Sequence, residues 1–142
     1  MITAVDSNVL LDVFGADPTF GRASREALRR CLSEGGLIAC DVVWAEVAAA
    51  FGSTDAAADA LDRLGVRYSP TTAPAAQAAG TAWRAYRRRG GSRERVIADL
   101  IVGAHARAQA DRLLSRDRGF YRELFTDLAV LDPRIDPSVS GR

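Results

Sequence analysis

Four carboxylic acids of this sequence stand among apolar residues, where an ionised side chain is costly to bury. Asp6 is the only charged residue among the first eleven, and Glu46 is the only one in residues 42–51. Asp99 is followed directly by three large apolar residues, and Asp117 comes shortly after an apolar pair. An ionised carboxylate is rarely buried unless it is paired or coordinates a metal. Four such residues indicate one common partner.

A divalent cation is the partner that this set of side chains favours. Four converging carboxylates would repel one another, and some of them would keep a proton at neutral pH. A bound cation removes this conflict, and oxygen-only ligands suit Mg²⁺ or Mn²⁺ rather than zinc. Such an ion activates water and stabilises the charge that develops when a phosphodiester is cleaved. The acids therefore predict metal-dependent hydrolysis of a phosphate ester.

Each acid also has a purely structural explanation. Asp6 could cap a helix, Asp99 could interact with a helix dipole, and Asp117 could be a turn residue. Glu46 is the hardest to explain in this way, because no charged residue lies three or four positions from it. Four independent coincidences are less probable than one shared site.

Strands that alternate with helices predict the element that positions these acids. The expected strands are residues 2–5, 37–40, 66–68, 112–115 and 129–131. The expected helices are residues 8–14, 18–34, 41–51, 54–64, 72–88, 95–110 and 118–125, with Asp41 as the cap of the third. This alternation predicts an α/β fold of three layers, in which helices cover both faces of a mainly parallel sheet.

The predicted sheet brings the acids toward one edge. Asp6 and Asp117 fall at the carboxyl ends of two strands, which is where ligands collect in open parallel sheets. Glu46 and Asp99 lie early in helices that could point at the same edge. We therefore expect one site to draw on segments from most of the chain.

Composition places the chain among globular proteins and indicates where it acts. Its 142 residues are enough for one domain with a real core. No apolar run approaches the roughly 18–20 residues of a membrane span, and the start of the chain lacks the basic segment of a secretory signal. Cys31 and Cys40 stand in apolar segments and are expected to be buried thiols in a reducing cytosol. We therefore expect a cytoplasmic protein.

The basic residues exclude two classes of phosphate chemistry. The net charge is +1, which argues neither for nor against a nucleic-acid partner. All 19 basic residues are arginine, which a GC-rich genome explains, and the sequence contains no lysine. A P-loop nucleotide site and a phosphatase of the haloacid-dehalogenase type normally use a lysine on phosphate, so neither is expected.

The segments around the four acids resemble, in their order and spacing, the motifs of PIN domains. They are residues 4–8, 41–47, 97–101 and 114–120. The resemblance extends over nearly the whole chain and is closest to VapC-type toxins. It implies a Mg²⁺-dependent endoribonuclease, usually a homodimer, that a cognate antitoxin neutralises. It also implies one PIN-like nuclease domain over residues 1–132, followed by a polar C-terminal tail at residues 133–142.

The resemblance assigns roles to individual residues. The metal-binding and catalytic acids would be Asp6, Glu46, Asp99 and Asp117. The supporting residues would be Ser7, which keeps the hydroxyl where many members have Thr, Asn8, which would orient the first Asp, and Ser115. The family often carries another acid or Asn near the fourth acid, whereas Arg116 and Arg118 stand there in this chain. The sequence thus leaves the number of metal ions, one or two, open.

A run of arginines is a second candidate for function. Arg84, Arg87 and Arg88 share a helix face, and Arg89, Arg93 and Arg95 continue the run through the glycines. One interpretation is a solvated helix end, where cations are favourable. The other is a group that binds RNA phosphates, with Trp83 or Tyr86 stacked on bases.

Two functional alternatives accompany the ribonuclease. The first is a PIN-like protein that binds RNA or a partner without cutting, although such a protein would not need all four acids. The second is a metal phosphohydrolase that acts on small phosphate esters. The arginine run favours a polymeric substrate over a small one.

Overall fold

A five-stranded parallel sheet lies at the centre of the protein in the computed structural model, which describes residues 1–94 and 96–135. The strands are β1 (Ile2–Val5), β2 (Gly36–Ala39), β3 (Val66–Tyr68), β4 (Arg112–Leu114) and β5 (Val130–Leu131). They follow the order β3-β2-β1-β4-β5, and each pair of neighbours runs parallel. The parallel α/β sheet expected from the sequence is confirmed.

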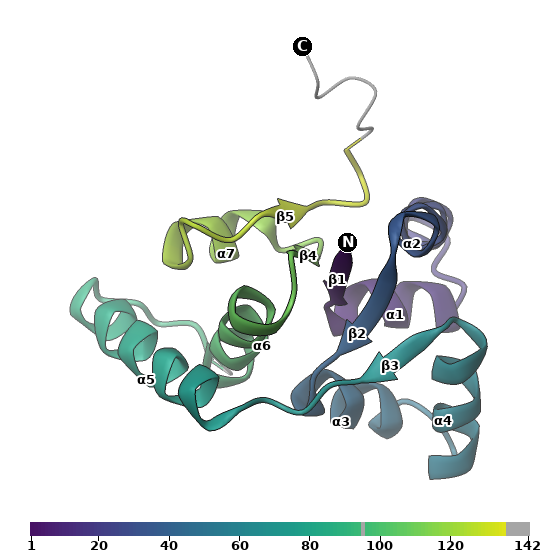
Figure 1. Cartoon of the computed structure of the whole chain (residues 1–142), viewed down its shortest axis with the longest axis horizontal. Coiled ribbons are helices and arrows are strands. Elements are labelled where there is room, and N and C mark those ends of the chain that lie inside the picture. Colours follow the sequence, from purple (N-terminus) through teal and green to yellow (C-terminus); the bar gives the residue numbers. More distant parts are fainter. Residues whose placement is uncertain (95, 136–142) are drawn as a thin grey trace.

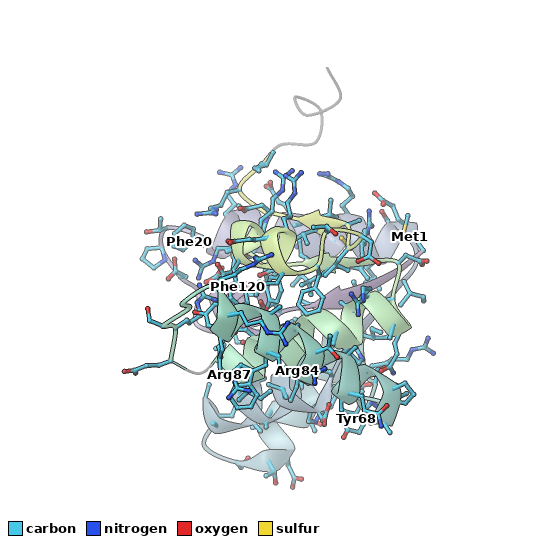
Figure 2. All side chains as sticks on the ribbon, turned by 90° about the vertical axis from the view of Figure 1, so that its left-hand side faces the viewer. Met1, Phe20, Tyr68, Arg84, Arg87 and Phe120 are labelled. Atoms are coloured by element: carbon cyan, nitrogen blue, oxygen red, sulfur yellow. The ribbon has the colours of Figure 1, made fainter. Side chains whose placement is uncertain are left out.

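Helices cover both faces of this sheet and complete the three layers. Their bounds are α1 (Ser7–Phe14), α2 (Gly21–Glu34), α3 (Asp41–Ala49), α4 (Thr54–Arg63), α5 (Ala73–Arg88), α6 (Val96–Gln109) and α7 (Arg118–Leu124). Figure 1 shows α1, α2 and α4 on one side of the sheet and α5, α6 and α7 on the other. Right-handed crossovers produce this division, because the chain moves across the sheet in one direction up to β3 and then returns past β1 to β4. In Figure 2, α5 lies in front of α6.

Two local expectations from the sequence are wrong. The second helix begins at Gly21 and not at Pro18, because the Asp17 carboxylate accepts hydrogen bonds from the backbone of Thr19 and Phe20 at 2.9 and 2.7 Å and holds a turn there. Asp41 does not cap its own helix. Its carboxylate accepts a hydrogen bond from the backbone N–H of Thr71 at 3.1 Å instead.

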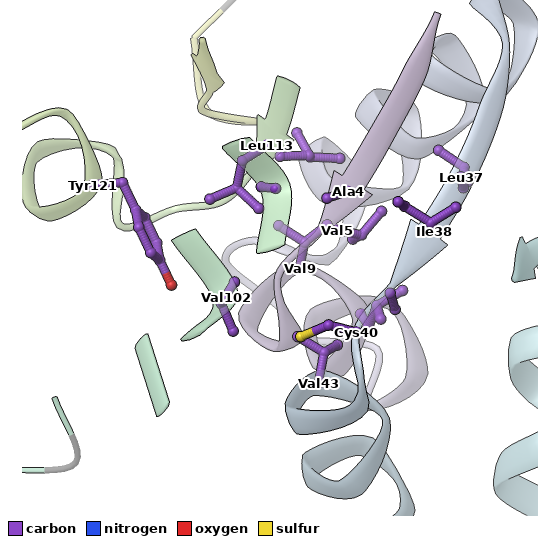
Figure 3. Close-up of a cluster of buried hydrophobic side chains, with 14 of the residues drawn as sticks. Ala4, Val5, Val9, Leu37, Ile38, Cys40, Val43, Val102, Leu113 and Tyr121 are labelled. Carbon is purple, nitrogen blue, oxygen red and sulfur yellow. The ribbon is translucent and has the colours of Figure 1, made fainter. Parts of the chain in front are cut away.

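The core fills the space between the sheet and the helices. Val5, Val9 and Leu113 are among its buried side chains, and Figure 3 shows them together where β1 leads into α1. Both cysteines are free and buried, as expected. No helix in the described ranges is long and apolar enough to span a membrane. The predicted tail begins with Pro133–Ile135, and its remaining residues, 136–142, lie outside the described part.

The position of β1 creates the place where a site can form. β1 pairs with β2 on one side and with β4 on the other, and Thr3 is in register with Arg112. The chain thus changes direction across the sheet between β1 and β4, and ligands of open α/β sheets bind beyond the strand ends at such a point. The backbone N–H of Asp6 donates to the carbonyl of Leu114 at 2.9 Å, so the two strand ends are joined there.

Candidate active site

Asp6 lies at the end of β1 and is buried, with 5% of its surface exposed. Its Oδ1 accepts the backbone N–H of Ser7 at 2.8 Å, so Asp6 does cap α1. Its Oδ2 accepts from two hydroxyls, Ser115 Oγ at 2.8 Å and Tyr121 Oη at 3.0 Å. Burial raises the pKa of Asp6 to about 6, although these hydrogen bonds act in the opposite direction. Asp6 thus caps α1 with one carboxylate oxygen and binds Ser115 and Tyr121 with the other.

Asp99 and Asp117 converge on one cation, the Arg93 guanidinium. Arg93 Nη1 lies 3.0 Å from Asp99 Oδ2 and 2.6 Å from Asp117 Oδ2. The guanidinium also stacks on the ring of Phe120, with its carbon 4.1 Å from the ring centroid. Two acids from α6 and from the turn after β4 therefore share one positively charged partner.

Asp6, Asp99 and Asp117 all affect the pKa of one neighbouring side chain, Tyr121. Burial raises the pKa of the Tyr121 hydroxyl well above its ordinary value, and the negative charges of Asp6, Asp99 and Asp117 raise it further. Asp99 also contributes to the raised pKa of Asp6. All three acids are therefore neighbours of Tyr121, and Asp6 accepts the hydrogen bond of its hydroxyl.

Glu46 approaches this group from α3. It is half-buried, and Ser7 Oγ donates to its Oε2 at 3.2 Å. Ser7 therefore contacts Asp6 through its backbone N–H and Glu46 through its hydroxyl. The structure places all four predicted acids in one region, connected by Ser7, Ser115 and Arg93.

Asn8 and Ser115 support this arrangement. Asn8 Nδ2 donates to Ser115 Oγ at 3.3 Å, and that same oxygen accepts the backbone N–H of Asp117 at 3.0 Å. Asn8 thus reaches Asp6 through Ser115 rather than by a direct bond. Arg116 turns away from the acids and binds Asp12 with Nε and Nη2 at 2.7 and 3.0 Å. Arg116 therefore does not neutralise Asp117, although the two residues are adjacent in the sequence.

The four acids offer only oxygen ligands to a metal ion. Within residues 1–94 and 96–135, no three Asp, Glu, His or Cys side chains are close enough together to enclose an ion. Asp99 and Asp117 nevertheless already direct oxygens at a single positive charge. Carboxylate oxygens are the ligands that Mg²⁺ and Mn²⁺ prefer, so the donor set fits such an ion once Arg93 moves aside.

Tyr121 and Asp12 were not singled out by the sequence analysis, and Arg93 was named there only as part of the arginine run. Tyr121 reaches Asp6, Arg93 bridges two acids, and Asp12 forms a buried ion pair with Arg116. Asp12 could have been noticed, because it stands between Leu11 and Val13 in an apolar helix. Ser24 Oγ and Arg116 satisfy its carboxylate, so its burial has a structural explanation.

The predicted RNA-binding arginines lie apart from the acids. Arg84, Arg87 and Arg88 are exposed on the last turns of α5. The Arg87 guanidinium lies over the Trp83 ring, 5.0 Å from its centroid, and Arg89 Nη1 is 3.4 Å from Glu123 Oε1. Arg87 and Arg93 line one hollow of the surface, and Arg93 also contacts Asp99 and Asp117.

The raised pKa of Asp6 predicts how pH affects the metal-free protein. The pKa is 3.8 for an ordinary Asp and about 6 in the fold, so folding takes up a proton between these values. The free energy of unfolding should therefore fall as the pH rises from about 4 to about 6, by at most about 3 kcal/mol for two pKa units. Urea unfolding in EDTA measures this loss. The loss should shrink in Asp6→Asn, and an equal loss in both proteins would contradict the assignment.

Comparisons with known proteins agree with this geometry. The sequence profile of the PIN domain matches residues 3–123. A comparison with curated protein sequences finds no significant match.

Several solved structures share the fold at low sequence identity. A chain of VapBC2 from Rickettsia felis, bound to a promoter DNA fragment, has a TM-score of 0.72 and 16% identity over 93% of this chain and 98% of that one. A chain of VapBC-1 from Haemophilus influenzae has a TM-score of 0.72 and 18% identity over 95% and 100%. VapC20 of Mycobacterium tuberculosis, described as a sarcin–ricin loop cleaving toxin, has a TM-score of 0.51 and 20% identity over 78% and 86%. Because the PIN profile covers most of the sequence, this chain belongs to the PIN-domain family.

Proposed function

We propose that this chain is a metal-dependent endoribonuclease of the VapC type and the toxin of a type II toxin–antitoxin pair. The observation that carries the proposal is the convergence of Asp99 and Asp117 on one cation, Arg93, together with the link from Asp6 through the Ser115 hydroxyl to the backbone N–H of Asp117. Membership of the PIN family supports nuclease chemistry. The proposed place of action is the cytoplasm.

The proposed mechanism divides the work among the residues of the site. The carboxylates of Asp6, Glu46, Asp99 and Asp117 would hold Mg²⁺ or Mn²⁺. When bound, the ion supplies an activated water and neutralises the charge of the phosphodiester. Ser115 and Tyr121 keep Asp6 Oδ2 in place by donating to it, and Ser7 links Asp6 to Glu46. Such supporting bonds fix the orientation of metal ligands in other metal sites.

Arg93 should compete with the metal, because both need Asp99 and Asp117. In Arg93→Gln, Mn²⁺ should bind roughly threefold to tenfold more tightly, as expected for removal of a partly exposed ion pair. Calorimetric titration of the two proteins measures the difference. Arg89→Gln is the matched control, because its partner Glu123 lies outside the acid group. Equal Mn²⁺ affinity in wild type and Arg93→Gln would show that Arg93 does not hold the metal position.

We propose RNA as the substrate and assign phosphate binding to the arginines in the last turns of α5 and directly after it. They are Arg84, Arg87, Arg88 and Arg89. Their exposure at one end of a helix beside the acids supports this role, since phosphate contacts position a nucleic acid without reading its sequence.

We also propose two protein partners. The first is a cognate antitoxin, which is supported by the likeness of this fold to chains in toxin–antitoxin structures. The second is another copy of this chain, because VapC-type toxins, which the sequence resembles, are usually homodimers. An antitoxin arginine could neutralise the acids with bidentate bonds, as Arg93 now does with single ones.

One experiment separates the proposed function from its alternatives. The purified protein is incubated with single-stranded RNA and with a small phosphate ester, each with Mg²⁺ and with excess EDTA. Cleavage of RNA that EDTA abolishes supports the nuclease, and turnover of the ester alone supports the phosphohydrolase. Binding of RNA without cleavage supports a PIN-fold binding protein, which the occupation of Asp99 and Asp117 by Arg93 favours.

A further inference from the structure

We propose that a hollow beside Trp83 binds a nucleobase of the RNA, next to the phosphate at the acids. The inference rests on the proposed function and names a subsite for it. The hollow measures about 380 Å³ and lies between the end of α5 and the start of α6. Trp83 and Arg87 line it from α5, Val96 and Ile97 line it from α6, and residues 91–94 border it.

The lining of the hollow suits a flat ligand with an apolar face. Ile97 is one of the few large hydrophobic side chains that are exposed, with 37% of its surface accessible. Trp83 is partly buried and packs against the core with its remaining surface. A ligand that binds here can bury apolar faces against Trp83 and Ile97 and place polar edges near the charged groups. A nucleobase is apolar on its faces and polar at its edges, so it fits this surface.

The Trp83–Arg87 pair supplies planar surfaces for stacking. The Arg87 guanidinium lies 5.0 Å from the centroid of the Trp83 ring, so the two groups already form a cation–π contact. Single-stranded RNA is commonly bound by stacking its bases on aromatic rings and on arginine planes. The pair therefore offers both kinds of surface at one place.

Tyr86 is excluded as the stacking residue because it holds the loop. Its hydroxyl accepts the backbone N–H of Arg93 at 2.6 Å, and its ring packs edge-on against Phe120 with centroids 6.1 Å apart. Gly91 lies on the same ring so closely that a Cβ there would be 2.3 Å from a ring carbon. Of the two aromatic residues that the sequence offered for stacking, only Trp83 is thus available.

Arg93 connects the hollow with the acids. It lines the hollow, and its Nη1 contacts Asp99 and Asp117. The two places are therefore separated by one side chain, so a nucleotide whose phosphate lies at the acids has a neighbouring base within reach of Trp83. Figure 2 shows Arg84 and Arg87 on the same side of the molecule as Phe120, which Arg93 covers.

The charge around the hollow favours RNA over a protein side chain as the occupant. Residues 84–93 contain five arginines and no acid, and Glu94 is the only acid in the lining described. A polyanion that crosses this surface gains from each arginine, and counterions are released as it binds. A side chain of an antitoxin is the competing occupant, and the test includes it.

The test uses the two tryptophans of the chain. In Trp44→Phe, Trp83 is the only indole, so its fluorescence reports on the hollow. The probes are a short single-stranded RNA and an abasic strand of the same length, both added in EDTA. We expect the RNA to quench Trp83 and the abasic strand to leave its emission nearly unchanged. We further expect Trp83→Leu to weaken RNA binding about fivefold to a hundredfold, the range that corresponds to one base–aromatic stack, and Trp83→Phe to retain it.

The controls distinguish the base site from other roles of Trp83. Tyr68→Leu removes an exposed aromatic ring that contacts Trp44 instead, and it should leave RNA affinity unchanged. Equal quenching by the two strands, or an equal loss of affinity for both in Trp83→Leu, would overturn the inference. So would a loss of antitoxin binding with RNA affinity intact, which would assign the hollow to a protein. If wild type cuts no RNA but the base-dependent quenching remains, the proposed nuclease fails and the base site stands.

Discussion

Asp99→Asn should lower the rate of RNA cleavage at least about a hundredfold, more than the roughly 10–100-fold that loss of a supporting residue usually costs in a metal site. Asp99 already directs Oδ2 at a positive charge 3.0 Å away, and asparagine keeps the shape of the side chain while removing its negative charge. The variant should remain folded, because like-charge repulsion toward Asp6 falls. Single-turnover cleavage at saturating Mg²⁺ measures the rate.

A control variant tests whether loss of any negative charge lowers the cleavage rate. Asp127→Asn removes an exposed acid whose partner is Arg107, with 3.7 Å between the charged atoms, at a distance from the site. Its cleavage rate should equal that of wild type. Full activity in Asp99→Asn, or in wild type with excess EDTA, would refute the proposed mechanism.

Expression of the wild-type chain alone should arrest the growth of a bacterial host. The proposed nuclease would cleave host RNA unless the proposed antitoxin blocks its site. Asp6→Ala and Asp99→Asn should leave growth normal, because each removes one of the proposed metal ligands. Growth curves after induction, with protein levels matched by immunoblot, measure the effect.

Co-expression extends this result to the partner. The small open reading frame beside the gene should restore growth, and its product should co-purify with the chain. A wild-type protein that is harmless at high expression, yet cleaves RNA in vitro, would remove the toxin assignment and leave the nuclease. Loss of growth arrest in Asp127→Asn as well would show that the effect does not depend on the site.

Asp6, Glu46 and Asp99 could be singled out because each is an isolated charge in an apolar segment, whereas Asp117 is flanked by Arg116 and Arg118 and stood out by its place after a strand. Asp6 and Asp117 follow strands, so the parallel sheet itself brings them to one edge, and the sequence contains enough information to place both. Glu46 was noticed because its helix offers no local partner. The structure adds the hydroxyls of Ser7 and Ser115, which connect the acids across 39 and 109 positions of sequence.

The contacts of Arg93 and Tyr121 could not be predicted in the same way. The partner of an arginine in a loop depends on the path of the backbone, which Tyr86 and Gly91 determine here by a close contact over the ring. Tyr121 lies in an ordinary amphipathic segment, and only the packing of α7 against β5 in the folded chain directs its hydroxyl at Asp6. Asp12 and Arg116 are likewise 104 positions apart and meet only in the folded chain.

The pairing of the first strand with the fourth also sets the time at which the proposed activity can begin during translation. Ser115 and Tyr121, the hydrogen-bond partners of Asp6, leave the ribosome 109 and 115 residues after it. At about 5–20 residues per second, Asp6 waits roughly 6 to 23 seconds for them. Until β4 has left the ribosome, β1 can pair with β2 but not with β4. The proposed nuclease would therefore not act on its own message before its site is translated, and the proposed antitoxin, if made in the same interval, could bind the chain as that site is completed.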